Sequence, residues 1–255
     1  MRFHVMTLFP EMIEAAANTS ILGRAIAGGL IGLKTWNIRD YSKEKHRHVD
    51  DYPYGGGKGM LMMAEPVCDC FDAILEETAS RPRVLYMSPA GRTLDQTYVR
   101  ELAEEDELVL LCGHYEGIDE RAIEEMKAEE VSIGDYVLTG GELPALVLMD
   151  SVSRQIPGVL SEGSADVESF SDGLLEYPQY TRPEEYRGRR VPQILLSGDH
   201  GKVDEWRRNE SLKRTYARRP DLLDKAKLTK KDQKALNKLR VLDRLKEEAP
   251  KGQDL

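Results

Sequence analysis

Long apolar runs, cysteine pairs and the common nucleotide-binding fingerprints are missing from this chain of 255 residues. Without about 18 consecutive apolar residues it has no membrane-spanning helix, and without a basic stretch before an apolar one we expect no secretory signal. Cys68, Cys70 and Cys112 are odd in number and lack metal-ligand spacing, so we expect reduced thiols in a cytoplasmic protein. Neither G-x-G-x-x-G nor G-x-x-x-x-G-K-[ST] occurs, which removes the usual dinucleotide and nucleoside triphosphate sites.

Three short apolar segments, in contrast, are each followed by glycine. They are Val84–Met87 with a predicted turn at Ser88–Arg92, Leu108–Gly113, and the segment that reaches Ser132–Gly134. Short apolar runs bounded by glycine are typical of buried strands, and glycine lets the backbone approach a ligand because it has no Cβ. Ligands of open α/β sheets bind beyond the carboxyl ends of the strands. The three strand ends therefore predict one small-molecule pocket.

The charges of the chain are segregated. Residues 1–175 carry 15 basic and 31 acidic side chains, whereas residues 176–255 carry 21 basic and 14 acidic side chains. A basic segment provides the electrostatic footprint that phosphate binding needs. The sequence therefore predicts two functional parts, of which the C-terminal one is suited to nucleic acid.

A boundary between these parts falls at residues 161–169, which are small, polar and without apolar periodicity. We predict a first domain at 1–160, a linker at 161–173 that its composition makes disordered, and a helical domain at 174–255. The predicted elements are a strand at Arg2–Leu8 and helices at Ile21–Ala27, Val67–Leu75, Leu143–Gln155 and Lys225–Glu248.

Several long motifs resemble those of the bacterial tRNA (guanine-N1)-methyltransferases. The matching strings are Tyr52–Met60, Gly113–Arg121, Ser132–Leu138, Asp150–Arg154 and Gly173–Pro183, and the resemblance runs from Thr7 to Pro220. Motifs of this length and order are very specific. The resemblance implies an enzyme that uses S-adenosylmethionine to methylate N1 of guanosine 37 in tRNA, next to the anticodon.

The same resemblance implies the α/β fold of the knotted (SPOUT) methyltransferase superfamily. In this fold a mostly parallel sheet is followed by a trefoil knot near the end of the catalytic domain, the knot forms the cofactor pocket, and a small helical domain follows. Because true knots are nearly absent from proteins, no periodicity argument predicts one. The resemblance also implies a homodimer in which the partner subunit completes the RNA site.

The reaction itself requires a base and a cation. Guanine N1 carries a proton at neutral pH, so a general base must lie near that proton and a cation near O6, where negative charge develops. The resemblance assigns the cation role to Arg154. The family has an aspartate immediately before Ser-Phe, where this chain has Glu168, whose side chain is longer by one methylene. Asp166 is the competing base.

The resemblance assigns the cofactor pocket to the three strand ends. Backbone groups there suit adenine, whose edge presents both donors and acceptors. Glu116 is a candidate partner for the methionine amino group or for a Mg²⁺ ion, although the spacing alone does not establish a metal site. The matched residues are Tyr86, Met87, Ser88, Pro89, Gly113, Tyr115, Glu116, Gly117, Ile133, Gly134, Asp135, Tyr136, Val137, Leu138, Gly140, Gly141 and Pro144.

Two regions are candidates for contacting tRNA. A loop around Asp50 matches the family segment that contacts the base preceding the target, and its carboxylate suits a guanosine at position 36. The glycine run beside it is no phosphate loop, because glycine follows Lys58 and leaves no hydroxyl for Mg²⁺; we interpret it as a polar, mobile surface loop. The candidates are His46, Asp50, Gly55, Gly57 and Gly59 in this region, and Arg207, Arg208, Lys213 and Arg214 in the basic part.

Two other functions remain open beside the methyl transfer to guanine N1. The first is a non-catalytic tRNA-binding protein that keeps the fold and the cofactor site, which the departure from aspartate to glutamate permits. The second is a knotted methyltransferase that acts on another RNA nucleotide. Methyl transfer from labelled cofactor separates the first from the enzymes, and mapping the methylated position separates the enzymes from each other.

Overall fold

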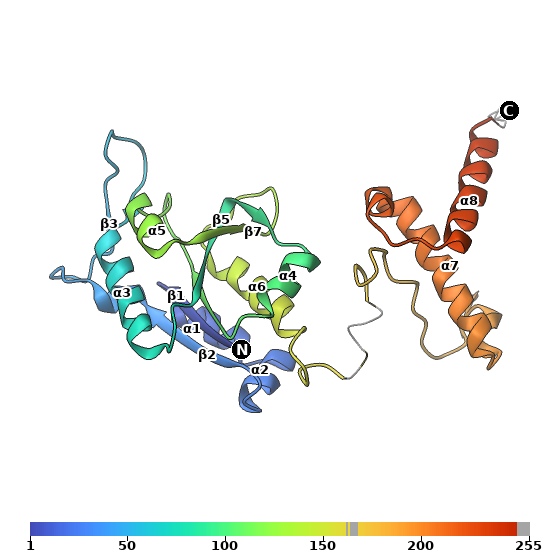
Figure 1. Ribbon diagram of the computed structural model, residues 1–255, viewed down its shortest axis with the longest axis horizontal. Helices are drawn as coiled ribbons and strands as arrows, with labels where there is room; N and C mark the ends of the chain where they lie inside the picture. The colour runs from blue at the N-terminus through green and yellow to red at the C-terminus, as the bar shows by residue number, and fades with distance from the viewer. Residues whose placement is uncertain (162, 164–167, 249–255) are drawn as a thin grey trace. The chain divides into compact units, whose positions relative to one another are not determined.

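The computed structural model describes residues 1–161, 163 and 168–248. The chain forms two compact units, Met1–Glu162 and Gly163–Leu255, and each is described by itself (Figure 1). Asp166, the competing base, lies outside the described residues. Within the described part of the chain, no helix combines the length and the apolar composition needed to cross a membrane.

A five-stranded sheet forms the centre of the first unit, and each pair of neighbouring strands runs parallel. This confirms the predicted α/β class with a mostly parallel sheet. The central strand is apolar over its whole buried length because helices cover both faces of a parallel sheet. The order is β2-β1-β6-β5-β7, with β1 at Arg2–Thr7, β2 at Gly32–Asn37, β5 at Arg83–Thr93, β6 at Glu107–Leu111 and β7 at Glu129–Ser132.

Successive side chains of one strand alternate between two apolar layers, as the pleat requires. Val5 and Leu110 belong to the first layer, and Met6 and Leu111 belong to the second. The helices that contribute to the first layer are α1 (Pro10–Ala17), α2 (Ser20–Ala27), α4 (Gln96–Leu102) and α6 (Glu142–Ser153), and those of the second are α3 (Ala64–Glu77) and α5 (Glu120–Met126). The predicted helices near α2, α3 and α6 are therefore present, with α6 ending at Ser153.

The segment after Met87 differs from the turn that we predicted at Ser88–Arg92. Strand β5 continues to Thr93, and both Met87 and Arg92 lie opposite Val131 of β7, so the residues between them form a bulge. A Cβ on Gly91 would lie 2.2 Å from the carbonyl carbon of Glu130. Pairing with β7 thus extends the strand through a Ser-Pro-Ala-Gly sequence that is locally typical of a turn.

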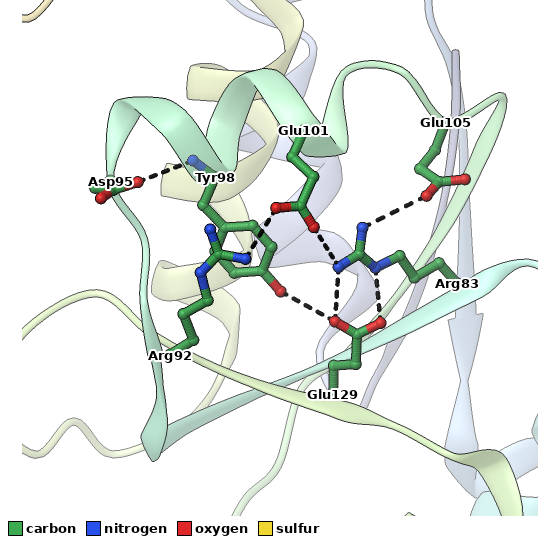
Figure 2. Close-up of polar contacts among 7 residues, drawn as sticks. All are labelled: Arg83, Arg92, Asp95, Tyr98, Glu101, Glu105 and Glu129. Carbon is green, nitrogen blue, oxygen red and sulfur yellow. Dashed lines mark hydrogen bonds and ion pairs between the residues drawn. The ribbon is translucent and has the colours of Figure 1, made fainter.

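An ion-pair network ties α4 to β5 and β7 (Figure 2). Arg83 donates to the two carboxylate oxygens of Glu129, both at 2.7 Å, and to Glu101 on α4 at 2.8 Å. Arg92 donates to Glu101 at 2.9 Å, and its guanidinium lies over the ring of Tyr98, 3.8 Å from the centroid. The network therefore fixes α4 against the two strands that border the bulge.

The second unit is a small helical bundle. Its helices are α7 (His200–Arg218) and α8 (Lys230–Glu248), and its core is formed by Leu174, Leu212, Leu223 and Leu236. The short elements that the structure also contains are β3 (Asp50–Asp51), β4 (Leu61–Met62), β8 (Glu185–Tyr186), β9 (Arg189–Arg190), and the 3-10 helices η1 (Ile38–Tyr41), η3 (Gln193–Leu196) and η4 (Pro220–Asp224).

The terminal helix begins at Lys230 and not at Lys225, where the leucine pattern placed its start. The Thr229 hydroxyl accepts from the Asp232 backbone N–H at 3.2 Å, and the Asp232 carboxylate accepts from the Thr229 N–H at 2.9 Å. This reciprocal pair is a capping box, which fixes the first turn of a helix. Leu228 therefore precedes the helix although it continues its apolar pattern.

Part of the predicted linker is packed against the helical unit. The Ser171 backbone N–H donates to the Glu168 carbonyl at 3.1 Å. A Cβ on Gly173, which has a positive φ of 85°, would lie 3.0 Å from the Cα of Ala226. Residues 168–173 thus have tertiary contacts with the helical unit, and the disorder that their composition predicts stays a prediction.

Candidate cofactor and RNA sites

A cavity of about 210 Å³ opens beside the bulge of β5 and the ends of β6 and β7. Its walls come from three segments that are distant in sequence but adjacent at the carboxyl edge of the parallel sheet, the edge where ligands of such sheets bind. The lining residues are Tyr86, Met87, Ser88, Pro89, Gly113, His114, Tyr115, Glu116, Gly117, Val131, Ser132, Ile133, Gly134, Tyr136, Val137, Leu138, Thr139, Gly140, Gly141 and Pro144.

The structure brings together around this cavity every residue predicted for the cofactor except Asp135. Four further lining residues were not predicted: His114, Val131, Ser132 and Thr139. All four lie inside or directly beside the motifs that carried the prediction. Their position between matched neighbours was the signal that could have identified them.

Two glycines of the cavity wall are required by close packing. A Cβ on Gly113 would lie 2.9 Å from the Tyr86 ring, and a Cβ on Gly141 would lie 2.6 Å from the Cα of Cys112. Gly141 has an ordinary φ of −84°, so the constraint there is space and not backbone strain. The absence of a Cβ therefore allows the glycine segment to pack directly against the end of β6 and against Tyr86.

A buried polar cluster that the sequence did not reveal lies beneath the glycine segment. Glu142, which is 3% exposed, accepts a hydrogen bond from the Thr7 hydroxyl at 2.7 Å, and its other oxygen lies 4.0 Å from Nε2 of His114. The Thr7 hydroxyl also accepts from the Phe9 backbone N–H at 2.9 Å. The carboxylate lies in the first turn of α6, where the helix dipole favours negative charge. This cluster connects the end of β1 to the cavity wall.

The catalytic candidates belong to different units. Arg154 is half-buried directly after α6 in the first unit, and its backbone N–H donates to the Asp150 carbonyl at 3.1 Å. Glu168 is half-buried in the second unit, where it borders a cavity of about 260 Å³ together with Tyr177 and Arg207. Each is therefore positioned by the fold of its own unit.

The loop candidates for RNA lie at an exposed hairpin connection. Asp50 pairs with Met62 across β3 and β4, whereas His46, Gly55, Gly57 and Gly59 are exposed. The base of this loop is attached to the wall of the cavity described above, because the Glu116 N–H donates to the Met60 carbonyl at 3.0 Å and the Met62 N–H donates to the Gly117 carbonyl at 2.9 Å.

The basic candidates on α7 have acidic partners. Arg207 contacts Asp204 at 3.3 Å, and Lys213 contacts Glu210 at 2.5 Å. Arg208 binds Asp232 through two hydrogen bonds and also binds Asp172. Arg214, on the same helix, is half-buried. In the described part of the chain, no group of three His, Cys, Asp or Glu side chains is arranged to hold a metal ion.

Fold and site together define a parallel α/β protein with a glycine-walled ligand cavity at the carboxyl edge of its sheet and a separate helical unit. Comparison with known proteins adds the particular family. The sequence profile described as tRNA (Guanine-1)-methyltransferase TrmD matches residues 1–225, and the chain belongs to this family of methyltransferases.

Curated relatives named tRNA (guanine-N(1)-)-methyltransferase are similar over most of their length. The protein of Lachnospira eligens is 60% identical over 225 residues, which cover 88% of this chain and 95% of the relative. That of Ruminiclostridium cellulolyticum is 58% identical, covering 88% and 97%. That of Alkaliphilus oremlandii is 54% identical, covering 92% and 97%.

Proposed function

We propose that this chain transfers a methyl group from S-adenosylmethionine to N1 of guanosine 37 in tRNA. The observation that carries the proposal is that the residues predicted for the cofactor, Asp135 excepted, line one and the same cavity at the carboxyl edge of the sheet. Membership of the tRNA (Guanine-1)-methyltransferase family supports the reaction class, and the relatives' names give guanine N1 of tRNA as the target. Position 37 rests on the motif resemblance.

The lining of the cavity suits the chemistry of the cofactor. Gly113 and Gly141 line the cavity without side chains, and Met87 and Leu138 add apolar walls. Such a surface suits adenine and ribose, and in this proposal Glu116, which lines the cavity, accepts from the methionine amino group or holds Mg²⁺. When bound, the cofactor supplies an electrophilic methyl group on its sulfonium.

The proton and the developing charge are handled by the chain's own side chains. Glu168 accepts the N1 proton of the target guanine, with Asp166 as the alternative base. Arg154 faces O6 and stabilises the negative charge that develops there as the proton leaves. The position of Arg154 directly after α6, whose inner face packs in the first apolar layer, supports this role, because a rigid element fixes the backbone from which the guanidinium extends.

The tRNA is held by two surfaces in this proposal. The loop between β3 and β4 presents Tyr54 and Tyr52, which are 99% and 78% exposed and are suited to stacking on unpaired loop bases. Asp50 at the start of this loop reads a guanosine at position 36. The helical unit with Arg207, Lys213 and Arg214 contacts phosphates, consistent with the positive charge of residues 176–255.

The family fold supports two further parts of the proposal, the trefoil knot and the homodimer. Close crossings at Gly91 and Gly141 are the kind of contact that a threaded chain requires. Leu143 and Val147 are about half exposed and one turn apart on α6, and Met12 on the neighbouring α1 is also exposed. We infer that a second copy of this chain covers this apolar face and completes the RNA site.

The test is methyl transfer from labelled S-adenosylmethionine to a tRNA transcript with guanosines at 36 and 37. We expect wild-type activity, its loss when adenosine replaces guanosine 37, and a decrease of about 10²- to 10⁴-fold in Glu168→Gln with cofactor binding retained. Asp166→Asn is the matched control and should stay active. An inactive wild type supports the non-catalytic binder, methylation elsewhere supports another target nucleotide, and an inactive Asp166→Asn moves the base to that residue.

A further inference from the structure

One face of α7 holds the segment that carries Glu168. Arg208, Ser211 and Thr215 are spaced by three and four residues, so their side chains lie on the same side of the helix. Each of them contacts the segment 172–175 through a hydrogen bond. We refer to these three residues as the α7 clamp.

The two hydroxyl groups of the clamp hold the backbone of Leu175. The Ser211 hydroxyl donates to the Leu175 carbonyl, and the Thr215 hydroxyl accepts from the Leu175 N–H at 2.9 Å. Thr215 is fully buried and donates its own proton to the Ser211 carbonyl at 2.8 Å. Both backbone groups of Leu175 are thereby fixed to one helix, so this residue has little freedom to shift along the helix surface.

Arg208 adds the side-chain part of the clamp. Its Nε and Nη2 donate to the two carboxylate oxygens of Asp232 at 3.1 and 2.9 Å, and its Nη1 donates to Asp172. The Asp232 side chain is only 5% exposed, so this pair is fixed to the start of α8. A guanidinium has donors on two edges in one plane, so Arg208 holds both oxygens of Asp232 and also binds Asp172; the single ammonium of lysine lacks this planar two-edged geometry.

Short hydrogen bonds connect the clamped residues to Glu168. The Phe170 N–H donates to the Leu174 carbonyl at 2.7 Å, and the Glu176 N–H donates to the Ser169 hydroxyl at 3.0 Å. The Ser171 N–H donates directly to the Glu168 carbonyl at 3.1 Å. A shift of the clamped segment is therefore transmitted to the backbone that carries the Glu168 carboxylate.

We propose that Arg208 is a positioning residue, which fixes the segment 168–175 and with it the Glu168 carboxylate, and does not serve to neutralise a tRNA phosphate. The inference rests on the proposed function, because it takes Glu168 as the general base. It reassigns Arg208 from the RNA contacts expected from the sequence, while Arg207, Lys213 and Arg214 keep that expectation.

The test combines single-turnover methyl transfer with tRNA binding at several salt concentrations. A single-turnover rate constant does not depend on the fraction of folded enzyme, so a merely structural defect leaves it unchanged. Arg208→Lys keeps the charge but loses the two-edged geometry, and we expect its rate constant to fall by about 10²-fold with an unchanged salt dependence of binding. Asp172→Asn removes one anchor from a half-exposed residue and should slow the step by about tenfold.

Arg218→Ala is the matched control, because Arg218 is an exposed cation at the end of the same helix, and we expect the wild-type rate constant. The proposal is overturned if Arg208→Lys reacts at the wild-type rate and Arg208→Ala lowers the salt slope of tRNA binding by about 1, which is the signature of a phosphate contact. Glu168→Gln distinguishes a failure of the base assignment from a failure of the proposed role of Arg208. A wild-type rate in that variant contradicts the base assignment, whereas a slow Glu168→Gln beside a fast Arg208→Lys contradicts the clamp alone.

Discussion

Replacing Gly141 by alanine tests the cofactor cavity through space alone. The new Cβ would lie 2.6 Å from the Cα of Cys112, where ordinary van der Waals contact begins at 3.4 Å, and both atoms belong to the backbone framework. The segment carrying Gly140 and Gly141 must therefore recede from the end of β6 by about 1 Å. Overpacking of this kind costs about 1–3 kcal/mol of unfolding free energy, and the cavity wall moves with it.

We expect Gly141→Ala to bind S-adenosylmethionine at least tenfold more weakly in isothermal titration calorimetry and to lose about 1–3 kcal/mol of stability in urea unfolding. Gly201→Ala is the matched control, because that glycine also lies at a helix start and its Cβ would meet nothing closer than 3.7 Å. Alanine in a helix is favourable, so the control should be as stable as the wild type or slightly more. Unchanged cofactor affinity in Gly141→Ala would refute the placement of the cofactor against this wall.

Three further variants test the packing and the charges around the two units. Arg83→Met should lower the unfolding free energy by about 1 kcal/mol in urea titrations, a modest loss because a half-exposed ion pair is partly screened. The Arg83 hydrogen bond lowers the pKa of Glu129 below its usual 4.5. The wild type should therefore lose the stabilisation from this pair as the pH falls through that lowered pKa, whereas the variant has no such stabilisation to lose. Asp232→Asn removes a carboxylate whose pKa the Arg208 hydrogen bonds lower to about 2. The variant should therefore lack about 2 kcal/mol of unfolding free energy that stabilises the helical unit of the wild type above pH 3.8. Trp206 fluorescence should show that the stability of the variant changes less than that of the wild type as the pH falls towards 2. Thr7→Val leaves Glu142 without its hydroxyl donor and should cost about 1–3 kcal/mol in thermal or urea unfolding, while Thr7→Ser should retain most of the stability; equal stability of Thr7→Val and wild type would contradict the importance of the buried cluster.

The local sequence pattern was sufficient to predict an element of the fold where the periodicity of apolar residues matches their burial. The apolar run at Leu108–Leu111 predicted the central strand because both of its faces are covered. The three glycine-bearing segments predicted the cavity because parallel strands bring their carboxyl ends to one edge, although Gly91 lies within β5 and not after it. The turn expected at Ser88–Arg92 was wrong because pairing with β7 outweighs the local preference for a turn. The start of α8 was wrong because a capping box, and not the apolar pattern, determines it.

Contacts between distant residues were beyond the reach of the sequence pattern. Glu142 follows two glycines and looks like the usual acidic residue of a first helical turn. Its partner Thr7, however, lies at the end of β1, far away in the sequence. Arg208 looks like one cation of a basic helix, and only the fold brings Asp172 and Asp232 to it. Both cases concern polar side chains whose partners are fixed by tertiary structure.

The strand order has a consequence for the synthesis of the chain. β1 pairs on one side with β2 and on the other with β6, with Arg2 opposite Glu107. One edge of β1 therefore lacks its neighbour until the polypeptide has grown past β6, and parallel pairing over such sequence separations is slow. Open strand edges are templates for association with other chains. The nascent protein thus passes through an interval in which the sheet is incomplete and β1 keeps an edge open to association.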